Sequence, residues 1–381
     1  MKLEIFQKSD RTRVDLIRTY DFVQYVDNFN GVGTFRMSIP YTEKSLPYLV
    51  RGNYILFEDG IMGIIKYRKK KTSESTTLEL KGYLLNEILG YRCFLRSHQY
   101  KDEITKVVRA MVSELFITSD DARRNVDFIV LATDEQYIPS SPSVSVQKTG
   151  DKLNVAVADL LQTIGYGYDL FPLVAKYDEK ADKPTNISAF EFRVRKPVDR
   201  TIDNADGNNP VVFSIELNNV TQLEYTEDST AYCSIAVVAG EGTGMQRIIV
   251  EAGDSEASGL DRIELYVDAR DLQSERYDGT TISADEYNEM LVHRGNERLQ
   301  EHVAFTTFDG TIRQGSLSYR YGVDFFKGDY VSLIDRELNI VVSAQITAVT
   351  KSITKTGEIF DVTFGYERST LKQLVTKRGV I

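Results

Sequence analysis

The chain is poor in the side chains that usually carry metal and redox chemistry. Tryptophan is absent, and the 381 residues include only two cysteines and three histidines. Cys93 and Cys233 are too few for a disulfide framework and do not form a metal-type pair, and their apolar surroundings predict buried, reduced thiols. His98, His293 and His302 show no zinc-ligand spacing. We therefore predict no metal site and no cofactor.

Export, membrane and nucleophile signals are also lacking. The first ten residues contain no apolar signal region, and no window approaches the roughly 18 apolar residues of a membrane span. The sequence contains no GxSxG motif, and neither cysteine has a neighbouring histidine that would suggest a nucleophile. We expect a protein assembled in a bacterial host cytoplasm, with no export signal, no membrane segment and no enzymatic activity.

Hydrophobic and aromatic residues are plentiful and favour a β-rich fold. Hydrophobic residues make up 42% of the chain, with 22 tyrosines and 18 phenylalanines, so a packed core is expected. The formal net charge is −10. Binding to phosphate backbones requires clustered Lys and Arg, so non-specific binding to nucleic acid or to an anionic membrane is not expected.

Short strand signals separated by turn residues dominate both ends of the chain. In the first hundred residues we predict strands over 2–6, 33–40, 54–58, 61–68 and 76–83, with turns at 58–60 and 72–75. Further strands are expected over 166–173, 189–196, 211–217, 234–240, 246–253 and 262–269. The segment 197–210 is predicted to be a loop, and the last eighty residues to be strands that end in a helix over 369–375.

Three helices are expected between the strands. Apolar residues recur at helical spacing over 101–116 and 151–165, with Asp102 and Asp151 as N-caps and Gly165 as the end of the second helix. The third helix, over 283–303, opens with a capping box from Ser283 to Glu286 and contains a glycine in its middle.

One segment of the chain resembles another. "RGNYILFEDG" from Arg51 is similar to "KGDYVSLIDR" from Lys327, so that Gly52 matches Gly328 and Tyr54 matches Tyr330. Both segments precede two more strand signals and a Gly-Tyr pair, although the alternation at that end requires a gap or a register slip. This pattern favours a duplicated small β-barrel over chance similarity between two strand–turn–strand units.

Three segments could bind ligands, but a structural role is favoured for each. The loop Gly240–Gly244 lacks the Gly-Lys-Ser/Thr of a phosphate loop and is followed by a predicted strand, so a hairpin connection is favoured. The "DNADGNN" segment lacks EF-hand ligands and favours an Asx-rich turn over a calcium site. The basic run at 66–71 favours a solvated hairpin tip over a phosphate contact.

The glycine loop and the sequence after it resemble siphophage tail-associated (Tal-type) hub proteins, often described as prophage tail proteins. The resemblance is carried by Gly240, Gly242, Gly244, Arg247, Gly259, Leu260, Arg262, Glu264, Asp268, Ala269 and Arg270. A C-terminal match is carried by Asp324, Phe325, Gly328 and Asp329, and an N-terminal match by "GTFRMSIP". The segment near residues 100 to 210 matches only loosely.

The resemblance implies a fold similar to the contractile-tail hub, which is α+β and β-rich, with two related small β-barrels flanking α/β domains. It implies a first barrel over 1–95, an α/β insertion over 96–215, an α+β domain over 216–304, and a second barrel over 305–381 that strands from other segments could complete. Many relatives continue into fibre or peptidoglycan-cleaving domains, whereas this sequence stops at Ile381, so either the protein is short or the sequence is trimmed.

The function implied by the resemblance is structural. Such a hub would be a homotrimer at the virion tail tip that closes the tube, adapts sixfold to threefold symmetry, and leaves a channel for genomic DNA in transit. Its partners would be the distal tail protein, tail-tube or tape-measure proteins, and fibre or receptor-binding proteins. Two alternatives stay open: a carbohydrate-binding tail adhesin that uses exposed aromatics, and a cell-wall hydrolase.

Overall fold

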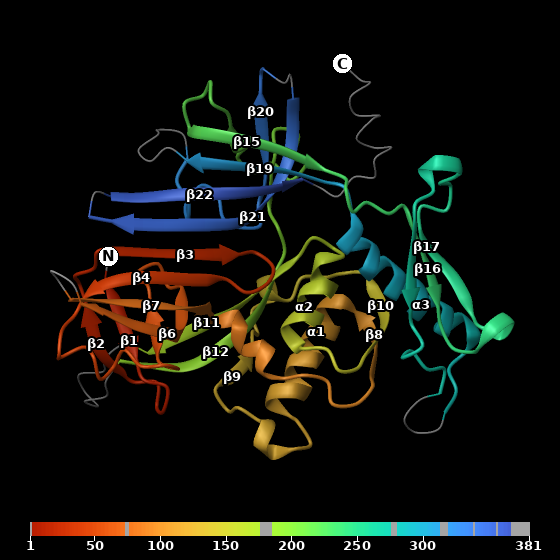
Figure 1. The fold of residues 1–381 in the computed structure, drawn as a ribbon, viewed down its shortest axis with the longest axis horizontal. Helices are drawn as coiled ribbons and strands as arrows, with labels where there is room; N and C mark the ends of the chain where they lie inside the picture. The colour runs from red at the N-terminus through yellow and green to blue at the C-terminus, as the bar shows by residue number, and fades with distance from the viewer. Residues whose placement is uncertain are drawn as a thin grey trace.

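The largest element of the fold is one sheet that contains strands from both ends of the chain (Figure 1). The computed structural model describes residues 2–72, 76–175, 185–275, 280–312, 319–337, 340–355 and 357–366. The helix expected over 369–375 lies outside these residues. The sheet has 14 strands, and most of its path follows the order β15-β19-β22-β21-β3-β4-β7-β6-β5-β1-β2.

The first strand set is built from the first 84 residues, where apolar and polar side chains alternate. All five predicted strands are confirmed, and the turn at 58–60 joins two of them as expected. Two strands that the sequence analysis did not identify, β2 and β3, complete the set. The bounds are β1 (Leu3–Phe6), β2 (Arg13–Ile17), β3 (Phe22–Asn28), β4 (Thr34–Pro40), β5 (Tyr54–Leu56), β6 (Met62–Thr72) and β7 (Thr76–Leu84).

The second strand set combines the C-terminal strands with segments from the middle of the chain. Its bounds are β13 (Asp199–Arg200), β14 (Val212–Phe213), β15 (Val220–Asp228), β19 (Phe305–Ile312), β20 (Tyr330–Asp335), β21 (Ile340–Thr354) and β22 (Gly357–Tyr366). β13 and β14 pair in parallel with β20, and β15 pairs with β19. Each strand set contributes its own hydrophobic cluster, as expected of two small barrels.

The two sets share one strand order, as the internal resemblance predicted. The order β3-β4-β7-β6-β5 of the first set is repeated as β15-β19-β22-β21-β20 in the second. The backbone bonds repeat as well: Gly52 N donates to Ile65 O at 2.8 Å, and Gly328 N donates to Ile346 O at 2.7 Å. A β-bulge follows Ile65 in β6 and Ile346 in β21.

Of the two possibilities that the sequence left open at the Gly-Tyr end, a gap or a register slip, the structure has the slip. Gly82 pairs with Ile65, whereas the equivalent Ile346 pairs with Phe364. The Gly365-Tyr366 pair is therefore displaced by one residue from the position of Gly82-Tyr83. A one-residue displacement moves side chains to the other face of a sheet, so the two ends cannot match in alternation.

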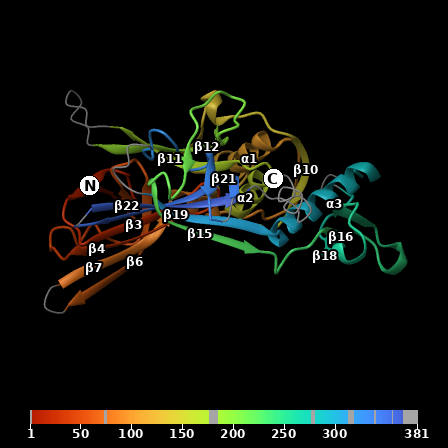
Figure 2. The same ribbon diagram turned by 90° about the horizontal axis from the view of Figure 1, so that it is seen from above.

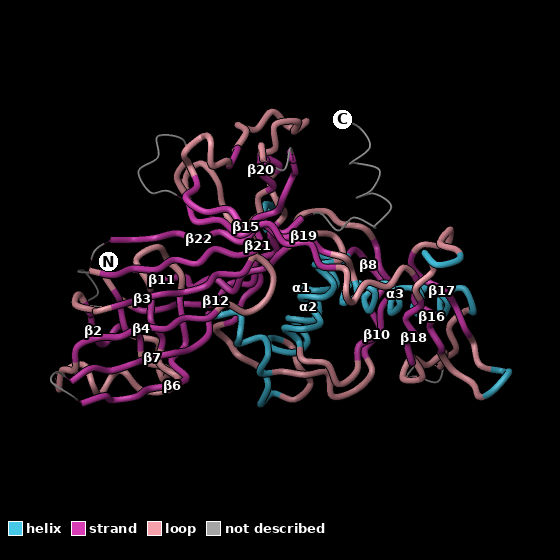
Figure 3. Tube along the Cα trace, turned by 45° about the horizontal axis from the view of Figure 1, so that its top comes forward, coloured by secondary structure: helices cyan, strands magenta, loops and turns pink. Residues whose placement is uncertain are grey.

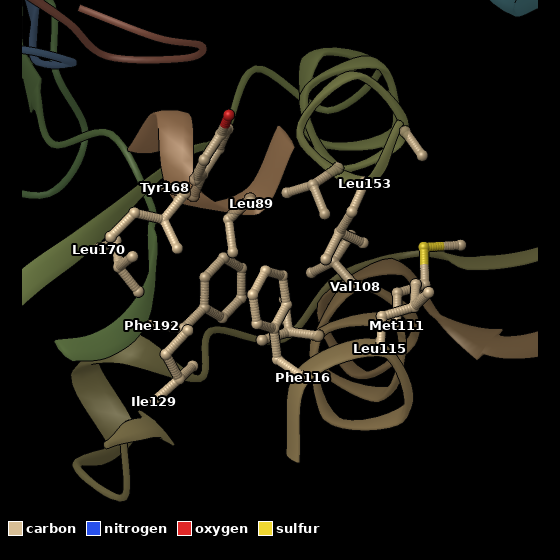
Figure 4. Packing of buried hydrophobic residues seen from close by; sticks show 14 of the residues in the cluster. Leu89, Val108, Met111, Leu115, Phe116, Ile129, Leu153, Tyr168, Leu170 and Phe192 are labelled. Carbon is tan, nitrogen blue, oxygen red and sulfur yellow. The ribbon is translucent and has the colours of Figure 1, made fainter. Parts of the chain in front are cut away.

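An α/β unit lies between the two sets in sequence, and Figure 1 shows it beside the first set and below the second. Helices α1 (Ile104–Val112) and α2 (Leu153–Gln162) bury their apolar stripes against the sheet β11-β12-β9, in a core that includes Leu115, Phe116 and Phe192 (Figure 4). The strands of this unit are β8 (His98–Glu103), β9 (Ile129–Leu131), β10 (Ser143–Lys148), β11 (Gly167–Ala175) and β12 (Asn186–Arg195).

Two predicted helix caps are wrong because other contacts occupy the chain before each helix. Asp102 belongs to strand β8, and Glu103 takes the N-cap position of α1 without a side-chain cap. Lys152 takes the N-cap position of α2 in place of Asp151, and Leu153 N donates to Arg92 O at 3.0 Å. Gly165 follows the end of α2 with φ +69°, as predicted.

The third unit interrupts the second strand set and extends to one side of the molecule (Figure 2). Residues 229–304 lie between β15 and β19, where the first set has only a short loop between β3 and β4. Its strands β16 (Ile235–Ala239), β17 (Ile249–Gly253) and β18 (Glu264–Asp268) are covered by α3 (Ala284–Leu299). The Ser283 cap is confirmed, since its side chain accepts from Glu286 N.

Short helical turns connect the longer elements. They are Leu85–Tyr91, Ala122–Arg124, Glu135–Tyr137, Gly244–Gln246, Gly259–Asp261 and Gln300–His302, with a π-turn over Ser113–Ile117. The loop predicted over 197–210 is confirmed except for the two residues of β13. Both cysteines are free, as expected, but only half-buried, because each follows or precedes a turn at the edge of its unit.

The matched glycines provide a test of the repeated architecture. Gly52 and Gly328 have φ +95° and +96°, which strains any L-residue. A Cβ at Gly52 would meet only the flexible Lys8 Cδ at 3.2 Å, whereas a Cβ at Gly328 would lie 2.2 Å from the Phe29 ring.

We predict that Gly52→Ala lowers the free energy of unfolding by about 1–2 kcal/mol through backbone strain. Gly328→Ala should lose about 1–3 kcal/mol more because of the clash with Phe29. Denaturant unfolding of both variants measures the difference, and equal losses would contradict the close packing at Gly328.

Candidate functional site

The two strand sets are joined edge to edge by one strand pair. Residues 348–354 of β21 pair antiparallel with Phe22–Asn28 of β3 through seven residue pairs, from Ala348–Asn28 to Thr354–Phe22. Figure 3 shows the path from β22 and β21 through β3 and β4 to β7 and β6. Because this pair joins the two related sets, its surroundings define the candidate site.

A buried lysine fixes one end of this junction. Lys327 Nζ donates to Asp27 Oδ1 at 2.6 Å and to Asp169 Oδ1 at 2.7 Å. Asp27 lies on β3 of the first set and Asp169 on β11 of the α/β unit, while Lys327 precedes β20 of the second set. One ammonium group therefore ties three units together.

Burial and mutual attraction shift the pKa of each member of this cluster. Burial alone would lower the pKa of Lys327, but attraction to Asp169 and Asp27 outweighs it and raises that pKa. Burial raises the pKa of Asp27, and the lysine offsets only part of this effect. Burial alone would raise the pKa of Asp169, but Lys327 and Arg195 together hold that pKa below its usual value.

A second ionic cluster lies nearer the other end of the junction. Lys351 Nζ on β21 lies 3.2 Å from Asp59 Oδ2 and 3.4 Å from Glu358 Oε2. The Tyr25 hydroxyl donates to Asp59, which belongs to the turn between β5 and β6. Burial, with the nearby Asp59 carboxylate, raises the pKa of Tyr25. Asp59 and Glu358 are more exposed than the partners of Lys327, at 30% and 40%.

The predicted C-terminal motif residues form the segment that carries Lys327. Asp329 Oδ2 accepts from Phe326 N at 2.9 Å and from Arg200 Nε at 2.8 Å. Burial raises the pKa of Asp329, and Arg200 opposes that shift. Asp324 stabilises a turn by accepting from Arg320 N at 2.7 Å. These contacts hold the backbone of the segment and position the lysine.

Tyr54, which matches Tyr330 in the internal resemblance, packs between the first set and the α/β unit. Its ring lies 5.3 Å from the ring of Phe190 on β12, at an interplanar angle of 68°. Burial raises the pKa of Tyr54 to about 12. Gly52 and Tyr54 therefore serve the fold of the first set, as their counterparts serve the second.

The glycine loop is a hairpin connection, as predicted. Gly240 N donates to Ile248 O, and β16 pairs antiparallel with β17 on either side of the loop. Gly242 and Gly244 have φ +98° and +57°, and only a three-residue turn follows before the next strand. The Glu241 carboxylate accepts from Ser274 N and Oγ at 2.6 and 2.9 Å, which ties the loop to its own unit.

Two arginines organise opposite ends of the sheet β17-β16-β18. Arg247 donates to Gly240 O, Ala239 O, the Tyr266 hydroxyl and Asp268 Oδ1, at 2.6 to 3.1 Å. At the other end, Arg262 pairs with Glu251 and Glu264 at 2.6 and 2.7 Å. Arg270 adds an exposed ion pair with Asp268. These motif residues have structural contacts within the third unit.

The sequence motifs thus form two separate groups, one at the junction and one in the third unit. The residues that sequence reasoning missed are those whose partners lie far away along the chain: Asp27, Asp169 and Lys327 at the junction, and Lys148 on β10, whose partner Glu297 lies on α3. Lys148 Nζ lies 2.7 Å from Glu297 Oε1 in a buried pair, and burial lowers the pKa of the adjacent His293. The Gly-Asp segment after Lys327 was the only local signal.

Among the described residues, no group of three or more His, Cys, Asp and Glu side chains is arranged to hold a metal ion. The "DNADGNN" segment is an Asx-rich turn, in which Asn204 Oδ1 accepts from Asn208 N at 2.9 Å. Within the same described ranges, none of the helices is long and apolar enough to cross a membrane.

The junction cluster predicts a large and pH-dependent cost for losing its lysine. Lys327→Met leaves the buried Asp27 carboxylate without a counter-ion and leaves Asp169 with Arg195 at 3.7 Å, so the free energy of unfolding at pH 7 should fall by about 3–5 kcal/mol. Burial then raises the pKa of Asp27 further above that of the unfolded chain, so protonation relieves the penalty and the loss should shrink from pH 7 to pH 5.

Lys351→Met is the matched control, because its carboxylate partners reach water. Its loss should be smaller and should depend less on pH. Denaturant unfolding at both pH values compares the two variants, and equal behaviour would contradict the role assigned to Lys327.

Arg247 provides a test in the third unit. Arg247→Ala removes four hydrogen bonds and should lower the stability of this unit by about 2–3 kcal/mol. Arg270→Ala removes an exposed pair and should cause no measurable loss. Hydrogen exchange of residues 235–275 reports local stability, and unchanged protection in the Arg247 variant would refute the assignment.

A family model and several solved structures are similar to this chain over most of its length. The family model of the siphovirus ReqiPepy6 Gp37-like protein matches residues 2–366. No curated protein sequence gives a significant match. The fold is similar to a 43 kDa tail protein of prophage MuSo2 from Shewanella oneidensis, with TM-score 0.55 and 11% identity over 96% of this chain and 98% of that one.

Two more solved structures share the fold. A tail protein from Neisseria meningitidis MC58 gives TM-score 0.53 and 13% identity over 96% of each chain. The prophage tail protein gp18 from Listeria monocytogenes EGD-e gives 0.52 and 11% over 100% of this chain and 98% of that one. The resemblance drawn from the sequence and the predicted β-rich α+β fold are thus confirmed, and the chain belongs to the siphovirus ReqiPepy6 Gp37-like protein family.

Proposed function

We propose that this protein is a structural component of a phage or prophage tail, and that three copies form the baseplate hub at the tail tip. The observation that carries the proposal is the repeated strand order within one chain, joined edge to edge by β21 and β3. A chain with two similar strand sets presents two similar surfaces, so three chains present six. The hub would then meet a sixfold tube on one side and a threefold tip on the other.

The contacts that hold the two strand sets together support this role. A symmetry adapter requires both sets to be held rigidly, and the Lys327 cluster ties both sets to the α/β unit. The third unit is inserted only in the second set, so the two strand sets of each chain are similar but not identical. Three such insertions around a ring would give the assembly its threefold face.

The partners follow from this position. We propose contacts with the distal tail protein and with tail-tube or tape-measure proteins on one face, and with fibre or receptor-binding proteins on the other. The net charge of −10 suits a ring through which genomic DNA passes without binding. The role is structural and non-enzymatic, in keeping with motif residues that serve the fold.

The proposal predicts a defined oligomer in solution. Light scattering over a concentration series should give a molar mass of three times the 43.2 kDa of one chain. A chain that stays monomeric at every concentration, both alone and with purified tail-tube protein, would contradict the proposal. A stable dimer would contradict it too, because six similar surfaces require three chains.

A further inference from the structure

The outer half of β6 is a sheet edge that carries a run of positive charge. β6 pairs with β5 only through Met62–Ile64, while its pairing with β7 continues to Thr72. Within the described part of the chain, one edge of residues 67–72 therefore has no neighbouring strand. The side chains of Tyr67, Arg68, Lys69, Lys70, Lys71 and Thr72 are all exposed.

Strand β15, at one end of the strand path, is an edge that carries negative charge. β15 pairs with β19 alone among the described strands. Glu224, Thr226 and Glu227 are exposed, and Asp228 is half-buried. Unpaired strand edges of this kind can pair with another chain, and native proteins usually protect them.

The junction inside the chain shows how these two edges can fit together. In that junction, the half of β21 beyond its bulge pairs with β3. By the shared strand order, β21 corresponds to β6 and β3 corresponds to β15. The free edge of β6 is therefore equivalent to the edge of β21 that pairs with β3. The free edge of β15 is likewise equivalent to the edge of β3 that pairs with β21.

The repeated hydrogen-bond pattern fixes the register of this second junction. Tyr67 and Ala348 are equivalent, because each is the first paired residue after its bulge. Val26 and Thr226 are equivalent, since Val26 pairs with Thr34 in the first set and Thr226 pairs with Thr307 in the second. Thr34 and Thr307 in turn pair with the equivalent residues Tyr83 and Gly365.

Transferring the pairing of Thr350 with Val26 therefore places Lys69 opposite Thr226. The neighbouring pairs follow at each step along the strands. They are Tyr67 with Asp228, Arg68 with Glu227, Lys70 with Tyr225, Lys71 with Glu224 and Thr72 with Leu223.

The charges complement one another in this register. Arg68 and Lys71 each face a glutamate, and Lys69 lies diagonally between Glu224 and Asp228 on one face of the sheet. A shift by one residue exchanges the faces, and in one direction it places Arg68 opposite Asp228 and Lys69 opposite Glu227. The register therefore comes from the backbone bonds alone, and the opposite charges independently support the pairing of the two edges.

We propose that β6 of one subunit pairs antiparallel with β15 of a second copy of this chain in this register. The inference rests on the proposed trimer and adds the strands, register and charged residues that build its contact. The two edges belong to different strands of the chain, so the contact is heterologous and closes into a ring only if the rotation allows it. Three such contacts would alternate with three internal β21–β3 junctions.

The first test is a charge-swap cycle at the pair formed by Lys71 and Glu224 of the partner subunit. Lys71→Glu and Glu224→Lys alone each place like charges opposite one another and should weaken association about tenfold per interface. The double variant restores opposite charges and should associate nearly as well as the unaltered protein. Lys196→Glu, which alters an exposed charge outside both edges, should have no effect.

The second test measures the register directly. With Cys93 and Cys233 replaced by serine, chains carrying Lys69→Cys are mixed with differently tagged chains carrying Thr226→Cys. A short bifunctional thiol reagent should crosslink the two kinds of chain to each other, while neither kind alone should crosslink. Replacing Thr226→Cys with Glu227→Cys moves the thiol to the other face and should reduce the yield at least severalfold.

The outcomes separate this inference from the proposed function. A trimer whose mass is insensitive to the charge variants and whose thiols do not crosslink would overturn the β6–β15 contact and leave the trimeric hub standing. Stronger crosslinking through Glu227 would overturn the register. A monomer with no crosslinking at any concentration would overturn both the contact and the trimer.

Discussion

The pairing of β21 with β3 is the interaction on which the rest of the architecture depends. Without it, the chain would contain two separate strand sets, each with its own core. With it, the two sets form one sheet, and the strand pair fixes the position of the second set relative to the first. The backbone bonds of the pair set the register, and the buried Lys327 cluster fixes the pair against the α/β unit.

A buried lysine between two aspartates is costly to form and stabilises mainly when every partner is present. This cost gives the junction specificity, because a displacement between the two strand sets would leave Asp27 buried without Lys327. The Lys351 cluster, which is more exposed, adds contacts across the same strand pair. The joint between the strand sets is thus held by charge geometry in addition to strand pairing.

The features that sequence reasoning predicted are those with a local signature. Alternation gave all five N-terminal strands that were predicted, helical spacing gave α1 and α2, and the capping box gave α3. The match of Gly52 with Gly328 predicted the repeat, since both positions require a positive φ. Asp102 and Asp151 failed as caps because strand β8 and the contact of Leu153 with Arg92 precede the helices.

The Lys327 cluster could not be predicted in the same way. Asp27, Asp169 and Lys327 lie on three units and share no spacing along the chain, so only the folded structure brings them together. The insertion of residues 229–304 between β15 and β19 hid the strand order of the second set for a similar reason. The basic run in β6 was visible in the sequence. Its proposed pairing with β15 could be inferred only once the equivalent strands of the two sets were aligned in the structure.

The central claim is that six similar strand sets form a closed ring from three chains. Single-particle cryo-electron microscopy of the purified oligomer tests this claim most directly. The account predicts three chains arranged so that strand sets alternate around a central opening, with internal β21–β3 contacts and β6–β15 contacts between subunits. An oligomer joined through the third unit, with the edges of β6 and β15 left open, would contradict it.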